Sequence, residues 1–576
     1  MEEIIAMNVQ ITKHHVDKEN KILEIEIECR TSRSHTEPKL RGSLVFDAGC
    51  GRRYFPIVAG NQQENGQERQ YFSKVSVDLS YVFFEKFPEP SERVKLSLAF
   101  CEPESLWSYE PASFDLPGEL FIRQQHSKNI LQKAGSMVLY GICTLLLPVW
   151  LLDGMLAVKG LHPLHEAAAG RHGKSAVIYH AHGLVHDLTG YGYSVREYKT
   201  GYFKKCYEHA CRKVPQTKGI LFLSERRVEN GGNLDRIRAC VQEKGLSYRE
   251  FLTETPVHKL SRKQIRECAE MVAEAKLIIL EDFVPQLHAL TMRPETQILQ
   301  MWHACGAFKL FGLSELGVVD HLAQSTRNHR SYTAALASSS GVVPFYSEAF
   351  GIDERCVRPV GVPRTDVFFD TAYREQIREA LFTRYPVCRD KKVILFAPTF
   401  RGSGNKTAYY PWEKFSVEKL MRELPQESVL ILKNHPFVRD CCEIPEEYQD
   451  RVLDLSREEN INDLLFITSV LITDYSSVIF EAVLLNIPIL FYTFDLQEYL
   501  EKRDLYFEFA AFAPGKIISD MEALIKAAAG LLDDPTEETS PAMTKTQFQR
   551  LFLDALDGHS TQRTMQLVEE LLATGD

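Results

Sequence analysis

Hydrophobic and polar residues alternate along the first 125 residues of the chain. Residues 23–28 read Leu-Glu-Ile-Glu-Ile-Glu, and the period of two continues in GSLVFDA, YFSKVSVDLS and RVKLSLAFC. Alternation of this kind is typical of strands that bury one face, and polar turns separate the segments. We therefore predict a small antiparallel β domain over residues 1–125, with an exposed hairpin tip in the polar stretch 61–70 (NQQENGQERQ).

An uncharged apolar segment follows at residues 134–152 (AGSMVLYGICTLLLPVWLL). Its nineteen residues are barely enough to cross a bilayer, and Pro148 and two glycines interrupt the pattern of a spanning helix. Basic residues lie further out on both sides. We interpret residues 126–174 as a membrane-surface anchor that lies in the plane of the bilayer or re-enters it. A core helix of the adjoining domain and a true membrane span are the alternatives.

From residue 175 onward, short apolar runs alternate with amphipathic helical stretches. The runs AVIYHA, GILFLS, AKLIILED and TQILQM form a first series, and KKVILFAP, SVLILK, SVLITD and IPILFYT form a second one that begins near Lys391. Helical sequences such as NLDRIRACVQEKG lie between them. This alternation implies parallel sheets covered by helices. We predict an α/β fold with two Rossmann-like domains, at residues 175–350 and 351–576, that face a common cleft.

Composition narrows the class of protein. The 576 residues are 44% hydrophobic and 25% charged, which are values of globular proteins. A net charge of -11 argues against nucleic-acid binding, which needs a basic face. The 13 cysteines include no CxxC pair, which fits a reducing cytosol. The first residues, MEEIIAMNVQITKHH, lack the apolar core of a signal peptide, so we do not expect secretion.

Candidate chemistry lies directly after the apolar runs, because ligands of open parallel sheets bind beyond the carboxyl ends of the strands. Two histidines occupy such positions, one in each series of runs. A histidine there can take a proton from a hydroxyl or support a leaving phosphate near neutral pH, although most histidines are structural. The residues that follow the runs are His303, Pro398, Thr399, Arg401, Lys433, Asn434, His435, Ser476 and Ser477.

The segment after residues 470–473 predicts a diphosphate site. Ser476 and Ser477 precede the apolar stretch VIFEAVLLN, which reads as a helix, so backbone N–H groups and hydroxyls could meet an anion there. The alternative is that the serines only cap the helix. Glu481 lies four residues after Ser477, on the same helix face, where it could accept hydrogen bonds from ribose hydroxyls.

Basic side chains beside these positions could neutralise phosphate oxygens as charge develops. Arg364 lies in GVPRTD, within the expected hinge, and Arg401 is a further candidate for a phosphate contact; solvated surface charge is the alternative reading. The chain has no D-x-D tripeptide and no His, Cys and carboxylate cluster with metal-ligand spacing, so we expect neither a protein-held metal nor a cofactor. GxSxG, Walker A and GxGxxG motifs are missing as well.

Five segments in serial order resemble the CDP-glycerol glycerophosphotransferases that build teichoic acids and related capsular polymers. They are WHACGAFKLFG, VGVPRTDVFF, VILFAPTFRG, LKNHP and LLFITSVLITDYSSVIFEAVLLNIPILFYTFDLQEY, within roughly residues 175–560. The resemblance implies a GT-B-like fold of two Rossmann domains. It also implies a peripheral or monotopic enzyme at the cytoplasmic face of the cell membrane of a Gram-positive bacterium.

By this resemblance, the enzyme transfers glycerol phosphate or ribitol phosphate from CDP-glycerol or CDP-ribitol to the terminal hydroxyl of a lipid-linked polymer and releases CMP. His303 would be the general base, and His435 would steady the transferred phosphate. A homo-oligomer is compatible with this reading. The implied donor-binding residues are Arg364, Pro398, Thr399, Lys433, Asn434, Ser476, Ser477 and Glu481.

The chain also departs from the motifs of the family. Ala304-Cys305-Gly306 stands where many members have Gly-Thr-Pro, and Lys433-Asn434 stands where many have Arg-Met. Two other functions remain open, because fold alone does not name a donor. One is a GT-B nucleotide-sugar glycosyltransferase of cell-wall or capsule synthesis. The other is a non-catalytic, membrane-bound assembly or polymer-binding factor with the β domain as its interaction module.

Overall fold

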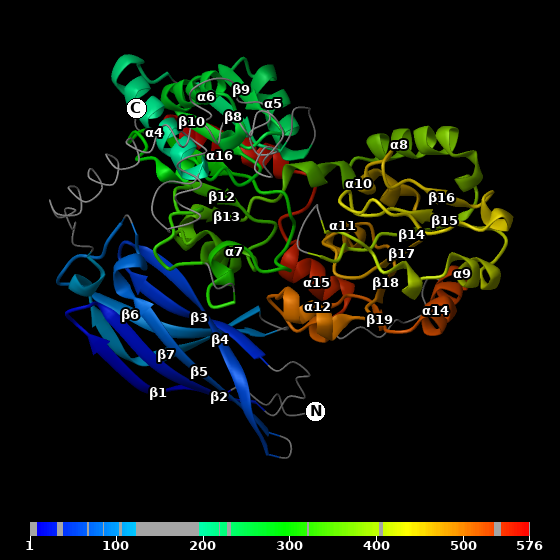
Figure 1. Ribbon diagram of the computed structural model, residues 1–576, viewed down its shortest axis with the longest axis horizontal. Coiled ribbons are helices and arrows are strands. Elements are labelled where there is room, and N and C mark those ends of the chain that lie inside the picture. The colour runs from blue at the N-terminus through cyan, green and yellow to red at the C-terminus, as the bar shows by residue number, and fades with distance from the viewer. Residues whose placement is uncertain are drawn as a thin grey trace, which may run out of the picture. The chain divides into compact units, whose positions relative to one another are not determined.

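A computed structural model gives the structure of the protein (Figure 1). It describes residues 8–31, 39–65, 68–84, 86–102, 106–122, 195–217, 219–226, 232–318, 322–402, 407–534 and 543–574. The predicted anchor at 126–174 and the predicted strand AVIYHA lie outside these residues.

The chain divides into two compact units. Unit 1 comprises Met1–Phe121, Met301–Thr326 and Ala334–Leu567, and unit 2 comprises Ile122–Gln300, Arg327–Thr333 and Val568–Asp576. The four segments expected from the sequence, 1–125, 126–174, 175–350 and 351–576, stay predictions.

The N-terminal part of unit 1 is a seven-stranded antiparallel sheet, in the order β1-β2-β5-β4-β3-β6-β7, which confirms the β region expected from the alternating pattern (Figure 1). Leu23, Ile25 and Ile27 point into its core, whereas Glu24 between them is exposed. The strands are β1 Asn8–Asp17, β2 Ile22–Thr31, β3 Lys39–Ala48, β4 Gly51–Asn65, β5 Glu68–Asp78, β6 Arg93–Glu102 and β7 Leu106–Pro117.

The sheet curls until its first and last strands meet. His14 of β1 stacks on Phe114 of β7, with ring centroids 3.7 Å apart. The predicted hairpin in residues 61–70 is confirmed, since β4 and β5 pair antiparallel up to Asn65 and Glu68. Because the sheet curls, its own strands enclose the hydrophobic core, and no second sheet is needed to cover it.

Buried polar contacts join this sheet to the rest of unit 1. The hydroxyl of Ser43 donates to the carboxylate of Glu348, in α7 (Val343–Phe350), and the hydroxyl of Ser314 donates to the same carboxylate at 2.6 Å. Arg53 of β4 pairs with Asp353 at 3.2 Å, and both side chains are under 10% exposed. The N-terminal sheet therefore packs as an integral part of unit 1.

The C-terminal part of unit 1 is a six-stranded parallel sheet in the order β16-β15-β14-β17-β18-β19. The second series of apolar runs forms its four central strands, as expected for strands buried on both faces. A short parallel pair, β12 and β13, lies in the same unit. The strands are β12 Ala334–Leu336, β13 Val357–Arg358, β14 Lys392–Phe396, β15 Ser428–Leu432, β16 Val452–Asp454, β17 Val470–Thr473, β18 Ile489–Tyr492 and β19 Lys516–Ile518.

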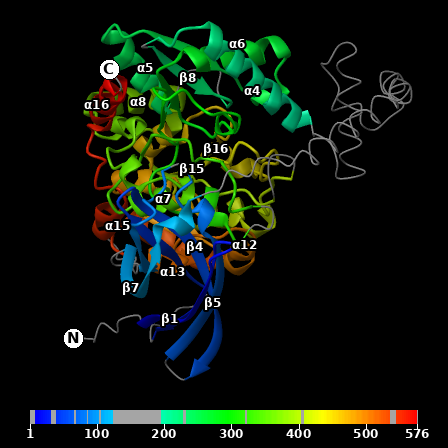
Figure 2. The same ribbon diagram turned by 90° about the vertical axis from the view of Figure 1, so that its left-hand side faces the viewer.

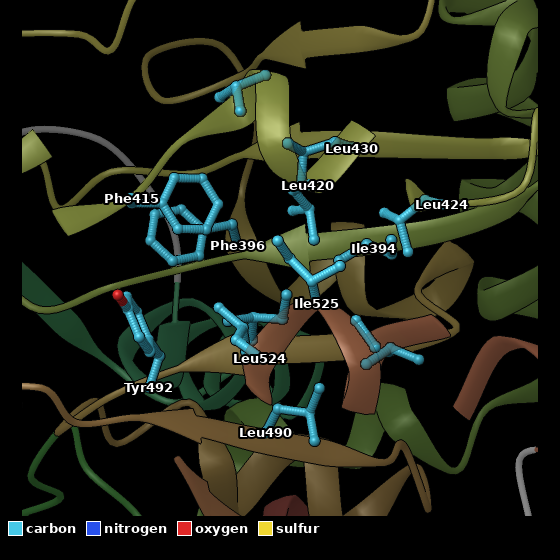
Figure 3. Packing of buried hydrophobic residues seen from close by; sticks show 14 of the residues in the cluster. Ile394, Phe396, Phe415, Leu420, Leu424, Leu430, Leu490, Tyr492, Leu524 and Ile525 are labelled. Atoms are coloured by element: carbon cyan, nitrogen blue, oxygen red, sulfur yellow. The ribbon is translucent and has the colours of Figure 1, made fainter. Parts of the chain in front are cut away.

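Helices α9 and α14 cover one face of the parallel sheet. Leu420 of α9 and Leu524 of α14 are fully buried against Ile394 of β14, and Figure 3 shows how closely these side chains pack. Each such residue contributes about 1.5–3 kcal/mol by leaving water. The helices of unit 1 are α7, α8 Thr371–Arg384, α9 Val417–Glu423, α10 Ile461–Leu464, α11 Ile479–Leu484, α12 Leu496–Lys502, α13 Phe509–Phe512, α14 Met521–Asp533 and α15 Lys545–Phe552, and α16 Ser560–Ala573 begins there.

Unit 2 holds four parallel strands in the order β11-β10-β8-β9. Three of them were expected from the first series of apolar runs. Helix α4 packs along α6, as Figure 2 shows. The elements are α4 Val195–Lys213, β8 Ile220–Ser224, α5 Gly232–Glu243, β9 Tyr248–Leu252, α6 Arg262–Glu274, β10 Leu277–Leu280 and β11 Gln297–Gln300. Among the described residues, no helix is both long enough and apolar enough to cross a membrane.

Candidate functional site

His303 lies on a loop of unit 1 whose backbone is bent at both ends. Trp302 has a φ of 56°, which is uncommon for a residue with a large side chain, and Gly306 has a φ of 63°. The Trp302 ring stacks on Phe311 at 4.9 Å and meets Phe350 edge-on at 5.4 Å. The packed indole thus holds an unusual backbone conformation directly before His303.

The far end of the loop is held at Gly306. A Cβ added there would lie 2.1 Å from the Phe480 ring, so only glycine fits without movement. The Gly306 N–H donates to the hydroxyl of Ser338 at 2.9 Å. The hydroxyl of Tyr346 donates to the carbonyls of Ala304 and Gly306 at 3.1 and 3.0 Å. These contacts fix the loop on both sides of Cys305.

Arg364 connects this loop to helix α11. Its Nε donates to the carbonyl of His303 at 3.3 Å, and its Nη2 donates to Oε1 of Glu481 at 2.5 Å. The side chains of Arg364 and Glu481 are 16% and 5% exposed, which makes the bond a largely buried ion pair. The structure therefore brings together three residues that the sequence predicted separately.

Cys305 also faces this pair. Nη2 of Arg364 lies 3.6 Å from its sulfur, and its thiol hydrogen-bonds to Glu481. Burial raises the pKa of the Cys305 thiol well above its usual value, and the nearby Glu481 carboxylate raises it further. The thiol is therefore protonated at neutral pH and acts as a hydrogen-bond donor to Glu481.

The contact between Glu481 and a ribose stays a prediction. Its carboxylate is engaged by Arg364 and Cys305, so a ribose would meet an acceptor that is already occupied. The sequence reasoning placed Arg364 and Glu481 on the donor individually. Their mutual pairing was not expected, because residues in different motifs give no spacing signal.

Arg401 lies in a buried cluster with two aspartates. Its Nε and Nη2 donate to the carboxylate of Asp495 at 2.6 and 2.9 Å, and its Nη1 donates to Asp474 at 2.9 Å and to the Thr399 carbonyl at 2.8 Å. Four rings surround the guanidinium at 5.1–5.7 Å, from Tyr410, Tyr475, Phe494 and Tyr499. This environment is that of a structural hub, and the phosphate contact predicted for Arg401 gains no support from it.

Pro398 and Thr399 follow β14 directly, as predicted, and both are buried. The Thr399 N–H donates to Asp474 at 2.7 Å. Asp474 thereby ties the loop after β14 to the loop after β17, at the carboxyl edge of the sheet.

His435 follows β15, and its ring is partly exposed. Burial lowers the pKa of His435 to about 4, and the positive charges of Lys309 and Arg503 act in the same direction. Its Nδ1 accepts a hydrogen bond from the Phe437 N–H at 3.2 Å. The imidazole is therefore neutral at pH 7 with its proton on Nε2, which makes it a hydrogen-bond donor toward a phosphate.

Lys433 and Asn434 contact the protein itself. The Lys433 ammonium donates to the carbonyls of Leu455 and Ser456 at 2.9 and 3.0 Å, and the Asn434 N–H donates to the Ser456 hydroxyl at 3.0 Å. Oδ1 of Asn434 is buried and accepts no hydrogen bond from the residues that the structure describes. Lys433 thus holds the segment after β16, and donor contacts of both residues stay predictions.

Ser476 and Ser477 lie between β17 and α11. Helix α11 has six residues and starts at Ile479, so it is shorter than the predicted helix. The Ser476 hydroxyl accepts weakly from the Val478 N–H at 3.4 Å, and neither serine is the N-cap residue. Ser477 is exposed, and its hydroxyl makes no hydrogen bond within the described part of the chain. Its hydroxyl is therefore accessible to a ligand.

A separate histidine cluster lies in unit 2. Nδ1 of His288 shares a hydrogen bond with the hydroxyl of Ser331 at 2.6 Å, and Nδ1 of His329 shares one with the hydroxyl of Tyr332 at 3.0 Å. Burial lowers the pKa of both histidines, to about 3 for His329. They are neutral core residues, as expected for most histidines of the chain.

The sequence reasoning missed two residues near His435. Lys309 and Arg503 are close enough to lower its pKa, yet they follow no predicted strand. Lys309 lies six residues after His303, so the two histidine loops approach each other within unit 1. The structure thus places two cations close enough to His435 to act on its charge.

Comparison with known protein families matches residues 206–570 to the family described as CDP-glycerol:poly(glycerophosphate) glycerophosphotransferase. The chain belongs to this family. A relative within the known proteins is the teichoic acid poly(ribitol-phosphate) polymerase of Bacillus spizizenii, 37% identical over 65% of this chain and 60% of that protein. Another is the teichoic acid ribitol-phosphate polymerase TarK of Staphylococcus aureus, 38% identical over 61% of this chain and 68% of that protein.

This member of the glycerophosphotransferase family also shares its fold with a solved structure. The wall teichoic acid polymerase TagF superposes with a TM-score of 0.53, over 65% of this chain and 93% of that one, at 19% identity. The parallel α/β sheets are therefore common to both proteins. The match with the Bacillus spizizenii relative spans 60% of that protein, so the family member described here corresponds to about three fifths of its length.

Proposed function

We propose that this chain transfers a polyol phosphate from a CDP-polyol to the terminal hydroxyl of a lipid-linked teichoic acid or capsular polymer and releases CMP. The observation that carries the proposal is the link from Arg364 to both the His303 carbonyl and Glu481. It joins three motifs of the glycerophosphotransferase family in one buried contact. A loop held in this way can position a catalytic imidazole without a covalent intermediate.

In the proposed reaction, His303 takes the proton of the acceptor hydroxyl. The acceptor oxygen then forms a bond to the β-phosphorus of the donor, and the bond between that phosphorus and the bridging oxygen of CMP breaks. The neutral His435 donates a hydrogen bond from Nε2 to the phosphate oxygens. Phosphoryl transfer depends mainly on positioning and on charge stabilisation, which these groups supply.

Ribitol phosphate is the donor group to test first. Both relatives named above are ribitol-phosphate polymerases, whereas the family description names glycerophosphate. We propose a polymerase of ribitol phosphate, with glycerol phosphate as the second donor.

The proposed architecture is GT-B-like, with two Rossmann-like domains that bind acceptor and donor on either side of a cleft. We place the enzyme at the cytoplasmic face of the membrane, because its acceptor is lipid-linked and because residues 134–152 are apolar with basic residues on both sides. We further propose that the transfer uses no protein-held metal, since Lys309, Arg503 and His435 can supply positive charge and hydrogen bonds. Activity would then persist in excess EDTA.

The experiment combines the purified full chain with CDP-ribitol or CDP-glycerol and a defined lipid-linked primer. CMP release is measured, and the products are sized by gel electrophoresis. We expect CMP release with at least one CDP-polyol and a loss of more than a thousandfold in His303→Ala. His559→Ala is the matched control, because that ring is exposed and lies in the same unit.

Two results would overturn the proposal. One is the absence of CMP release with either donor under conditions where the protein is folded. The other is stabilisation against heat by a UDP- or GDP-sugar and not by a CDP-polyol, which would indicate a glycosyltransferase.

A further inference from the structure

Lys309 and Arg503 are brought together by backbone pairing between two distant loops of unit 1. The Leu310 N–H donates to the Asp504 carbonyl at 3.1 Å, and the Tyr506 N–H donates to the Phe308 carbonyl at 2.9 Å. Lys309 and Leu505 form the antiparallel bridge between them. The position of both cations is therefore set by main-chain hydrogen bonds.

Aromatic rings line the space around these cations. Nζ of Lys309 lies 5.7 Å from the centroid of Tyr499, and the guanidinium of Arg503 lies 5.2 Å from that of Phe400. The Phe400 ring is in turn 4.6 Å from the ring of His435. Arg503 and His435 thus share the Phe400 ring, and Lys309 lies at Tyr499. All three residues are partly exposed, so a ligand can reach them.

Neither cation forms an ion pair within the described part of the chain. The carboxylate that attracts Lys309 is Asp474, which is already bound to Arg401. The cluster of Arg401, Asp474 and Asp495 has a net charge of one negative unit. The side chains of Lys309 and Arg503 add two positive charges. One positive charge therefore remains at this place, in a protein whose net charge is -11.

The pKa of Lys309 reflects its burial and the neighbouring positive charges. The pKa of Lys309 is lowered to about 8, chiefly by burial; Asp474 acts in the opposite direction, and the positive charges of Arg503 and Arg401 act in the same direction as burial. Lys309 still carries its charge at pH 7. Unpaired cations in a partly desolvated place are unfavourable, and an anion that binds between them would offset this.

We propose that Lys309 and Arg503, together with Nε2 of His435, bind a phosphate group of a substrate. This inference deepens the proposed function and rests on it for the identity of that substrate. The phosphate belongs either to the diphosphate of the nucleotide donor or to a phosphodiester of the acceptor polymer. Arg503 offers a planar set of donors to two phosphate oxygens, and Lys309 supplies a point charge.

Calorimetric titration with inorganic pyrophosphate tests the site, because this probe carries neither nucleoside nor polyol. We expect Lys309→Gln and Arg503→Gln each to weaken pyrophosphate binding at least tenfold. Lys309→Arg keeps the charge and should bind within a few fold of the wild type. Lys419→Gln and Arg422→Gln, on the exposed face of α9, are the matched controls and should bind as the wild type does.

A second measurement follows the ring of His435 by NMR and needs no activity. Lys309→Gln should raise the pKa of His435, because it removes a positive charge that lowers it. Pyrophosphate should raise it in the wild type as well. Melting temperatures within a few degrees of the wild type show that the variants are folded.

The outcomes separate this proposal from the proposed function. Competition by CDP assigns the phosphate to the donor, and competition by a short polyol-phosphate oligomer assigns it to the acceptor; either supports the site. Pyrophosphate binding that depends on both residues would stand even if no CMP is released. Wild-type affinity in both folded Gln variants, or no pyrophosphate binding at millimolar concentration, would overturn it.

Discussion

Arg364 and Glu481 form a 2.5 Å ion pair whose guanidinium also donates to the carbonyl of His303. The pair lies beneath the loop of the candidate base, and Cys305 closes it on one side. In the proposed reaction, Arg364 would act on catalysis through the backbone of His303. We therefore propose a positioning role for Arg364 beside the predicted contact with the donor.

Glu481→Gln should lower kcat at least a hundredfold and reduce the free energy of unfolding by about 3 kcal/mol, because it leaves a largely buried guanidinium without its counter-charge. Arg364→Lys should not rescue function, since one ammonium cannot reach the Glu481 carboxylate and the His303 carbonyl together. CMP release and urea denaturation measure the two effects. The exposed pair Arg389 and Glu379 is the control: Glu379→Gln should change neither quantity appreciably. Equal kcat in Glu481→Gln and wild type would contradict the positioning role.

His435 should titrate near pH 4 in an NMR experiment, because burial and two cations disfavour its protonated form. Because the pKa is lowered, the His435 ring stays neutral between pH 5.5 and 8.5. Its ionisation therefore causes no change of kcat with pH in that range. His435→Gln should lower kcat roughly a hundredfold without altering the shape of the pH profile of kcat. A titration midpoint near 6.5 would show that the ring is not desolvated as described.

Gly306→Ala should distort the His303 loop. A methyl group there would overlap the Phe480 ring, and the φ of 63° disfavours any side chain. We expect a loss of about 2–4 kcal/mol in unfolding free energy together with a large loss of activity. Gly245→Ala isolates the backbone effect, because Gly245 has a φ of +66° and nothing within 4 Å of its added Cβ. That control should lose only about 1 kcal/mol and keep full activity.

Glu348 should make the stability of unit 1 depend on pH. Burial raises its pKa to about 7, although Ser314, Ser43 and Arg41 act in the opposite direction. The folded state thus holds its proton more tightly than the unfolded state, so this stabilisation is complete below about pH 4 and is lost as pH rises to 7. The Glu348→Gln variant has no carboxyl group to ionise at this position. The difference between its free energy of unfolding and that of the wild type should therefore shift in favour of the variant by roughly 3 kcal/mol from pH 4 to pH 8. Chemical denaturation at both pH values checks this, with the exposed Glu522→Gln as control; a constant difference would rule out ionisation of Glu348.

Several strands could be predicted from the sequence because the pattern of apolar residues within each strand shows which faces are buried. The strands β8, β10, β14, β15, β17 and β18 are continuous apolar runs, and β2 alternates with a period of two. Shorter strands such as β12, β13 and β16 have only two or three residues, too few for a periodic signal. The candidate positions after the long strands followed from the same rule.

The sequence by itself determined which residue types follow the long strands, including His303 after β11 and His435 after β15. Only the tertiary structure decided what they contact. The pairing of Arg364 with Glu481, the enclosure of Arg401 by two aspartates, and the approach of Lys309 and Arg503 to His435 all join residues far apart in the chain. Hydrogen bonding and ionisation depend on distance and burial in three dimensions, and neither is encoded in local spacing.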